Sequence, residues 1–107
     1  KYNFFKTPTN DSDYFNSYHL YPLVINFKKL KKNKNELMKF FLKNNVRLQV
    51  HYIPTYRMTA FKNWNKIKFP ISEEVFKNII SVPIFDSLKK NEIDKVIKLF
   101  KVFFKLK

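Results

Sequence analysis

The residues best suited to chemistry lie together around Pro54. His51 and Tyr52 precede this proline, and Tyr56 and Arg57 follow it. These side chains could hold a hydroxylated, phosphorylated ligand, because Arg can clamp a phosphate with two hydrogen bonds and Tyr can stack on a ring or hydrogen-bond to it. The spacing alone also allows a structural interpretation, in which the tyrosines are core or rim aromatics and the histidine is a hydrogen-bonded strand residue.

His19 is the other of the two histidines in the chain. It alternates with Leu20 in an expected strand, so it too is either a ligand-binding or a structural residue.

Composition excludes several other kinds of site. The chain has no Cys and no Gly, which removes thiolate metal ligands and glycine-rich nucleotide loops. Its eight Asp and Glu show no ligand-like spacing to either histidine, and there is no nucleophile elbow. We therefore expect no metal site and no stand-alone hydrolase.

The net charge of +14 on 107 residues requires an explanation. One explanation is a surface that binds nucleic acid or an anionic membrane. The other is drift in base composition, because Lys, Asn, Ile, Phe and Tyr have AT-rich codons and only Arg47 and Arg57 are arginines, the residue that nucleic-acid surfaces favour. No apolar run approaches the roughly 20 residues of a membrane helix. We expect no nucleic acid and no membrane as partner, and keep a basic nucleic-acid-binding module as an alternative function.

The elements that must position these residues alternate between strands and helices. Residues 1–17 are typical of a connector without a regular element, and the expected elements are a strand at 18–27, a helix at 35–44, a strand at 46–52, a loop at 56–70 with a short helix near 59–63, a helix at 72–78, an extended piece at 81–84 and a helix at 91–105. Pro22 indicates an edge position or a break in the first strand. The order predicts a small α+β domain with helices on one face of a mainly antiparallel sheet of about three strands.

The helix ends carry their own signals. Asn33 or Asn35 is suited to cap the first helix, and Asn44 followed by Asn45 is suited to end it, since Asn tolerates the left-handed conformation best after Gly. Ser72 before two glutamates predicts the start of the next helix.

Several short segments match, in chain order, the motifs of one family. They are SYHLYP at 17–22, VHYIP at 50–54, PISE at 70–73, SVP at 81–83 and the helix pattern at 88–97. Together they resemble the DegT/DnrJ/EryC1/StrS family of pyridoxal-phosphate (PLP)-dependent sugar aminotransferases, over residues 17–107. The run at 49–58 is most similar to the branch that makes pseudaminic-acid precursors. Departures are the missing glycine before Val46, Ser72 in place of alanine and Lys89 in place of a Ser or Thr cap.

The resemblance implies that residues 18–107 are the C-terminal small domain of an aspartate-aminotransferase-type fold, joined by the connector 1–17 to an N-terminal PLP-binding domain. That domain carries the Schiff-base lysine, so no catalytic residue and no PLP site are expected in this chain, which would be inactive alone. By the same resemblance, His51 and Tyr52 contact the sugar nucleotide, and Arg57 contacts its phosphate or uracil side. Tyr56, at a position where many members have His, contacts the substrate as well. His19 would support the pocket wall.

The implied reaction transfers an amino group from glutamate to C4 of a UDP-linked 4-keto-6-deoxy sugar, for bacterial surface polysaccharide or flagellin glycan. The implied enzyme is a cytoplasmic homodimer with most dimer contacts in the large domain, so this chain alone can be monomeric. Because the sequence begins at Lys1 with a connector-like stretch, we expect some kind of truncation of a longer protein, either a cut domain, the ordered part of a longer chain or a natural truncation. A folded remnant without activity is the remaining alternative.

Overall fold

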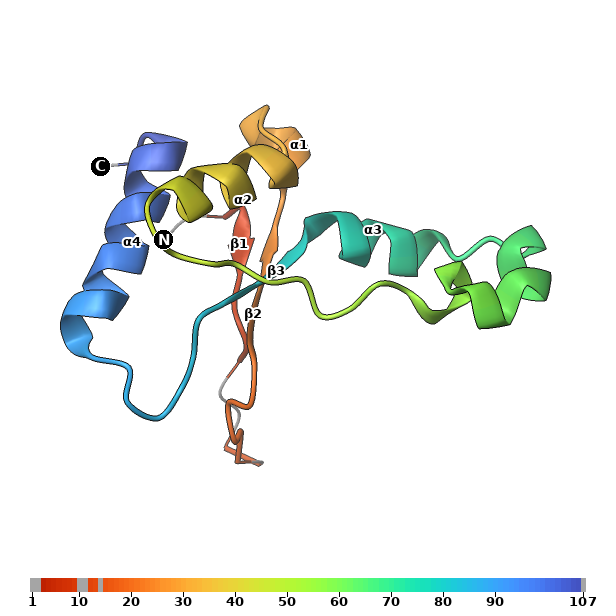
Figure 1. The fold of residues 1–107 in the computed structure, drawn as a ribbon, viewed down its shortest axis with the longest axis horizontal. Coiled ribbons are helices and arrows are strands. Elements are labelled where there is room, and N and C mark those ends of the chain that lie inside the picture. Colours follow the sequence, from red (N-terminus) through yellow and green to blue (C-terminus); the bar gives the residue numbers. More distant parts are fainter. Residues whose placement is uncertain (1–2, 10–11, 14, 107) are drawn as a thin grey trace.

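The computed structural model describes residues 3–9, 12–13 and 15–106, and it gives no side-chain burial for residues 62 and 65. Figure 1 shows a small sheet with helices above and beside it and a long excursion to one side. In chain order the elements are β1 (Phe5–Lys6), β2 (Tyr21–Ile25), α1 (Phe27–Leu30), α2 (Lys34–Lys43), η1 (Thr55–Arg57), η2 (Thr59–Lys66), α3 (Pro70–Asn78), β3 (Ile79–Val82) and α4 (Lys90–Phe104).

The sheet has three antiparallel strands in the order β1-β2-β3, which confirms the predicted α+β class. The segments that form its strands differ from the prediction in two places. β1 lies inside the supposed connector, where Phe5 pairs with Ile25 of the central strand. The segment 46–52 is not a strand of the ladder, because its only pairing with β3 is an isolated bridge between Gln49 and Ser81. The prediction of a strand there was wrong, and so was the expectation that residues 1–17 hold no regular element.

Pro22 lies in the central strand rather than in an edge strand. Among the described residues, however, β1 pairs only with Val24 and Ile25, so it does not reach the proline. On its other side Pro22 is opposite Ser81 of β3. A proline lacks the N–H that a second neighbour would require, which explains why this end of β2 has one partner strand.

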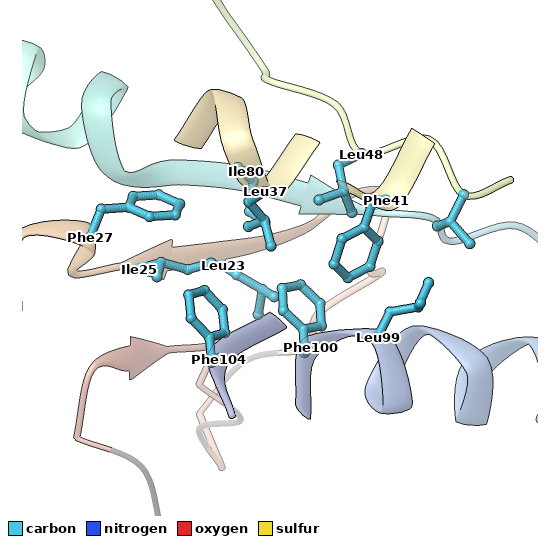
Figure 2. Close-up of a cluster of buried hydrophobic side chains, with 11 residues drawn as sticks. Leu23, Ile25, Phe27, Leu37, Phe41, Leu48, Ile80, Leu99, Phe100 and Phe104 are labelled. Atoms are coloured by element: carbon cyan, nitrogen blue, oxygen red, sulfur yellow. The ribbon is translucent and has the colours of Figure 1, made fainter. Parts of the chain in front are cut away.

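One face of the sheet carries the hydrophobic core. Leu23 and Ile25 alternate along β2, and Ile80 of β3 pairs with Leu23, so all three side chains point to the same face. Helices α2 and α4 close over this face, with Phe41 of α2 packed against Phe100 of α4 at 4.7 Å between ring centroids. Figure 2 shows these side chains meeting between the strands and the two helices. The predicted packing of helices on one face holds for α2 and α4.

The helix ends agree largely with the predicted signals. Asn33 caps α2 with a reciprocal capping box to Glu36. Asn45 has φ of 57°, the left-handed conformation expected of the residue that ends this helix. α3 begins earlier than predicted, with Pro70 rather than Ser72 at its start. Lys89 precedes α4 where a Ser or Thr cap is usual.

Residues 52–78, which we call the arm, project from the sheet as two neighbouring legs with η2 at the tip (Figure 1). The outgoing leg runs through η1, and the returning leg is α3. Within the described part of the arm no hydrophobic side chain is buried, and Tyr52, Ile67 and Ile71 are more than half exposed. The arm therefore lacks a core of its own.

Candidate functional site

His51 is positioned by β3. Gln49, two residues earlier, exchanges two backbone hydrogen bonds with Ser81, at 2.7 and 3.0 Å, which fixes the extended segment beside the strand. The Nδ1 atom of His51 then lies 2.9 Å from the Oγ atom of Ser81, the only polar side chain among the buried residues of the described chain. This hydrogen bond orients the imidazole and leaves Nε2 as the ring atom available to a ligand.

His51 and His19 line the same cavity. The cavity has a volume of about 250 Å³ and is lined by His19, Leu20, Arg47, Gln49, His51, Val82, Pro83, Ile84 and Phe85. The expected role of His19 as part of the pocket wall stays a prediction, but the structure does bring the two histidines to one place. Sequence reasoning missed Arg47 and Gln49. The signal was present, because positions 47, 49 and 51 share one face of an extended segment.

Tyr52 stands beside this cavity with most of its side chain in solvent. Its ring packs edge-on against His51, with 4.8 Å between the ring centroids. The tyrosine is 68% exposed, and the peptide bond that joins it to His51 is cis. An exposed phenol next to an oriented imidazole offers a stacking face and a hydroxyl to a ligand.

Tyr56 and Arg57 meet a carboxylate on the opposite leg of the arm. The hydroxyl of Tyr56 donates to Oε1 of Glu73 at 2.7 Å, and the guanidinium of Arg57 donates from Nε to Oε1 at 2.9 Å and from Nη2 to Oε2. The ring of Tyr56 also stacks on Phe69, with 4.4 Å between the centroids. We call the three residues Tyr56, Arg57 and Glu73 the latch, because they join the outgoing leg to α3.

The latch shifts the titration of its members. The hydrogen bonds from Arg57 and then from Tyr56 lower the pKa of the Glu73 carboxyl. The same carboxylate raises the pKa of the Arg57 guanidinium. Partial removal from water, followed by the hydrogen bond to Glu73, raises the pKa of the Tyr56 hydroxyl. The latch is therefore a charged pair with a neutral phenol at ordinary pH.

The sequence cluster around Pro54 is thus divided in space. His51 faces the cavity with His19, whereas Tyr56 and Arg57 line a separate pocket with Glu73, and the two sets of lining residues do not overlap. Glu73 was not singled out from the sequence. Its position in the first turn of α3 is a helix signal, and nothing local indicates a partner 16 residues earlier.

Between residues 3 and 106, outside the undescribed positions, no three His, Cys, Asp or Glu side chains gather as a metal ion would require. Over the same part of the chain, no helix has the length and apolar character needed to cross a bilayer.

The chain belongs to the DegT/DnrJ/EryC1/StrS aminotransferase family, whose model matches residues 2–101. It is 31% identical over 98 residues to the uncharacterised protein MJ1066 of Methanocaldococcus jannaschii. The aligned region covers 89% of this chain and 25% of that protein. It is 25% identical over 96 residues to a dTDP-3-amino-3,6-dideoxy-alpha-D-galactopyranose transaminase of Aneurinibacillus thermoaerophilus, again covering 89% of this chain and 25% of the relative. The chain therefore spans about a quarter of the length of these relatives.

Solved aminotransferases share the fold. DesI, determined in the presence of its TDP-sugar product, superposes with a TM-score of 0.83 at 13% identity and covers 95% of this chain and 26% of its own. Spr1654 from Streptococcus pneumoniae in its PLP form gives 0.79 at 23% identity, with coverage of 95% and 26%. PseC of Helicobacter pylori, involved in pseudaminic acid biosynthesis, gives 0.72 at 23% identity, with coverage of 81% and 24%. The fold is that of a domain of the aspartate-aminotransferase type.

Proposed function

We propose that the chain is the C-terminal domain of a PLP-dependent sugar-nucleotide aminotransferase and that the cavity beside His51 faces its substrate. The observation that carries the proposal is the cavity itself: two histidines, Arg47 and Gln49 gather at one sheet edge in a chain of this family. Arg and amide groups hydrogen-bond well to phosphates and sugar hydroxyls. Polar groups at the border of a rigid sheet are well placed to orient a ligand.

Each residue has a separate task in this proposal. Ser81 holds the His51 ring, so that its free nitrogen can hydrogen-bond to the sugar nucleotide. Tyr52 covers the ligand from the solvent side, and His19 supports the wall. Arg57 contacts the phosphate or uracil side, and Tyr56 lies next to it, both held by Glu73. Orientation and exclusion of water by such groups accelerate a reaction without proton transfer from them.

PLP supplies an electron sink for amino-group transfer when it is bound. The described residues form open, polar cavities rather than an enclosed pocket in which a lysine could bind the PLP ring. They are therefore better suited to contact a substrate than to bind the cofactor alone. We therefore assign PLP to a preceding domain, with residues 1–17 as the connection to it, although β1 also belongs to the sheet. We assign no catalytic residue to this chain, which would be inactive alone.

The finer features of the proposal come from the sequence resemblance. They are glutamate as amino donor, C4 of a UDP-linked 4-keto-6-deoxy sugar as acceptor, the pseudaminic-acid branch, a homodimer and a cytoplasmic location. PseC, the transaminase of Aneurinibacillus thermoaerophilus and DesI share the family or the fold, and their different sugars show that the acceptor must be tested directly.

The deciding experiment isolates the native polypeptide, measures its mass and records its absorbance. We expect a chain roughly four times as long as this one, given the 25% coverage of its relatives, with the absorbance of bound PLP. In that enzyme, His51→Ala should raise KM for the sugar nucleotide, whereas Lys98→Gln on the exposed side of α4 should leave it unchanged. A colourless native protein of this length would refute the proposal and make salt-dependent RNA or DNA binding the next measurement.

A further inference from the structure

A second concave site is separate from the histidine cavity. It is a cleft of about 600 Å³ between the first turn of α2, η1 and the end of α3, and it shares no lining residue with the histidine cavity. Its lining residues are Phe27, Lys32, Asn33, Lys34, Asn35, Glu36, Lys39, Arg57, Phe76, Lys77 and Asn78. The volume is in the range of small-ligand sites.

Five cations and one carboxylate line this cleft. The cations come from separate parts of the chain, namely the stretch from Lys32 to Lys39, Arg57 of η1 and Lys77 of α3. Glu36 is the one lining carboxylate, and an oxygen of it already accepts from the backbone N–H of Asn33. Glu73, just outside the lining, pairs with Arg57. The remaining field in the cleft is positive, which suits an anion.

Phe76 is the lining residue that two of these cations share. Lys34 lies with Nζ 4.5 Å from the centroid of this ring, and Arg57 lies with Cζ 5.0 Å from the same centroid. The ammonium of Lys34 also donates to the backbone carbonyls of Phe76 and Ile79, so it is held rigidly between α2 and the end of the arm. Partial burial, followed by the charge of Arg57, lowers the pKa of Lys34. Two fixed like charges around one ring repel each other, and an anion placed beside them would relieve the repulsion.

We propose that this cleft binds a small anion of the diphosphate type, at a site distinct from the histidine cavity. Lys34 and Arg57 form its fixed floor, and the exposed ammonium groups of Lys39 and Lys77 close on the anion from two sides. A polynucleotide fits less well, because the Phe76 ring that would stack on a base already carries two cations. The site shares Arg57 with the proposed contact to the sugar nucleotide, and its test does not require aminotransferase activity.

The test titrates inorganic pyrophosphate into the 107-residue chain at about 0.15 M ionic strength. Calorimetry should show saturable binding of one pyrophosphate, and amide resonances of the first turn of α2 and of the end of α3 should shift most. The double variant Lys39→Gln with Lys77→Gln should weaken binding about tenfold, since each loses a charge-assisted contact. Lys39→Glu, a single change at an exposed position, should weaken it at least as much.

The matched control is Lys98→Gln with Lys101→Gln, which removes the same charge from exposed positions on α4. Its affinity for pyrophosphate should stay within about twofold of the parent, because charges beyond a Debye length are screened. Equal weakening by both double variants would mean diffuse attraction to a basic protein and would overturn the site. Resonance shifts spread over lysines of α4, or no saturation, would overturn it as well.

Discussion

The body of the molecule and its arm are stabilised in different ways. The body, formed by the sheet, α1, α2, the extended segment after α2 and α4, holds all eleven buried hydrophobic side chains of the described chain, and the arm holds none. The legs of the arm are joined instead by a carboxylate that accepts hydrogen bonds from a tyrosine and an arginine, and by the stack of Tyr56 on Phe69. Burial of apolar side chains depends little on pH or on charge screening by salt, whereas a partly exposed ion pair depends on both.

The comparison bears on function because the candidate residues belong to both regions. His51 is oriented by a buried serine of the body, whereas Tyr56 and Arg57 are oriented by Glu73 within the arm. A change in the arm should therefore disturb the positions of Tyr56 and Arg57 and leave His51 in place. The single tryptophan of the chain, Trp64, lies in η2 at the tip of the arm and can report on that region alone.

The largest effect is expected from the body. Phe41→Ala removes a fully buried ring at the contact between α2 and α4, so it should lower the free energy of unfolding by about 3–5 kcal/mol. That is a large part of the ~5–15 kcal/mol available to a small domain. Urea unfolding followed by far-UV circular dichroism measures it. The neighbouring Leu42→Ala, at a side chain 58% exposed, should stay within about 0.5 kcal/mol of the parent; equal losses would refute the assigned helix face.

A smaller, local effect is expected from Glu73→Gln. The substitution keeps the shape of the side chain and removes the charge that holds Arg57. Trypsin should then cleave after Arg57, Lys66 and Lys68 several times faster, while the urea midpoint of the body changes less than in Phe41→Ala. Glu74→Gln removes the same charge at the next, exposed position and should leave the cleavage rate unchanged. Faster cleavage in both variants would show that the latch does not hold the arm.

The arm should also respond to acid before the body does. The folded-state pKa of Glu73 lies below its ordinary value of about 4.3, so the latch stabilises the arm above that value and is lost as pH falls through the lower folded value. The emission of Trp64 should change in this window at a pH where the far-UV signal is still native. Glu73→Gln should abolish the early change. Coincident transitions in the parent would contradict the separation of arm and body.

The smallest effect concerns the end of α4. Lys105 adopts φ of 54°, a left-handed conformation that a side chain disfavours. Lys105→Gly should therefore raise the free energy of unfolding by about 1 kcal/mol. Lys101→Gly, inside the same helix, should lower it by a similar amount. Thermal unfolding measures both, and a destabilising Lys105→Gly would contradict the described helix end.

Local sequence signals predicted the helices, but they did not predict strands whose pairing partners lie far away in the chain. The period of α4, the Asn33 cap and the Asn45 end are short-range features, so they could be read from the sequence. β1 was missed because two residues in a polar, proline-containing stretch carry no period, and their partner lies 20 positions later. The alternation of apolar and polar residues at 46–52 correctly indicated that Val46 and Leu48 are buried. It could not show that this segment forms only one isolated bridge instead of a strand of the sheet.

The candidate site shows the same limit. The sequence places His51 to Arg57 in one cluster because they are neighbours in the chain. In space the chain turns away at Pro54, so the cluster divides between a cavity and the latch. Neither Arg47 nor Glu73 could be assigned to it without the pairing of Gln49 with Ser81 and the return of α3 beside the outgoing leg.

The position of β1 has a consequence for how this domain can be exchanged between family polypeptides during evolution. Phe5 supplies backbone pairs to β2 and an aromatic contact to Phe100 and Phe104, with ring centroids 5.8 and 5.5 Å apart. A recombination junction between residues 7 and 20 would join a foreign strand to this sheet and a foreign ring to this core. Viable chimaeras should therefore have their junctions before Phe5, so that this strand and its ring stay with the sheet and core that they complete.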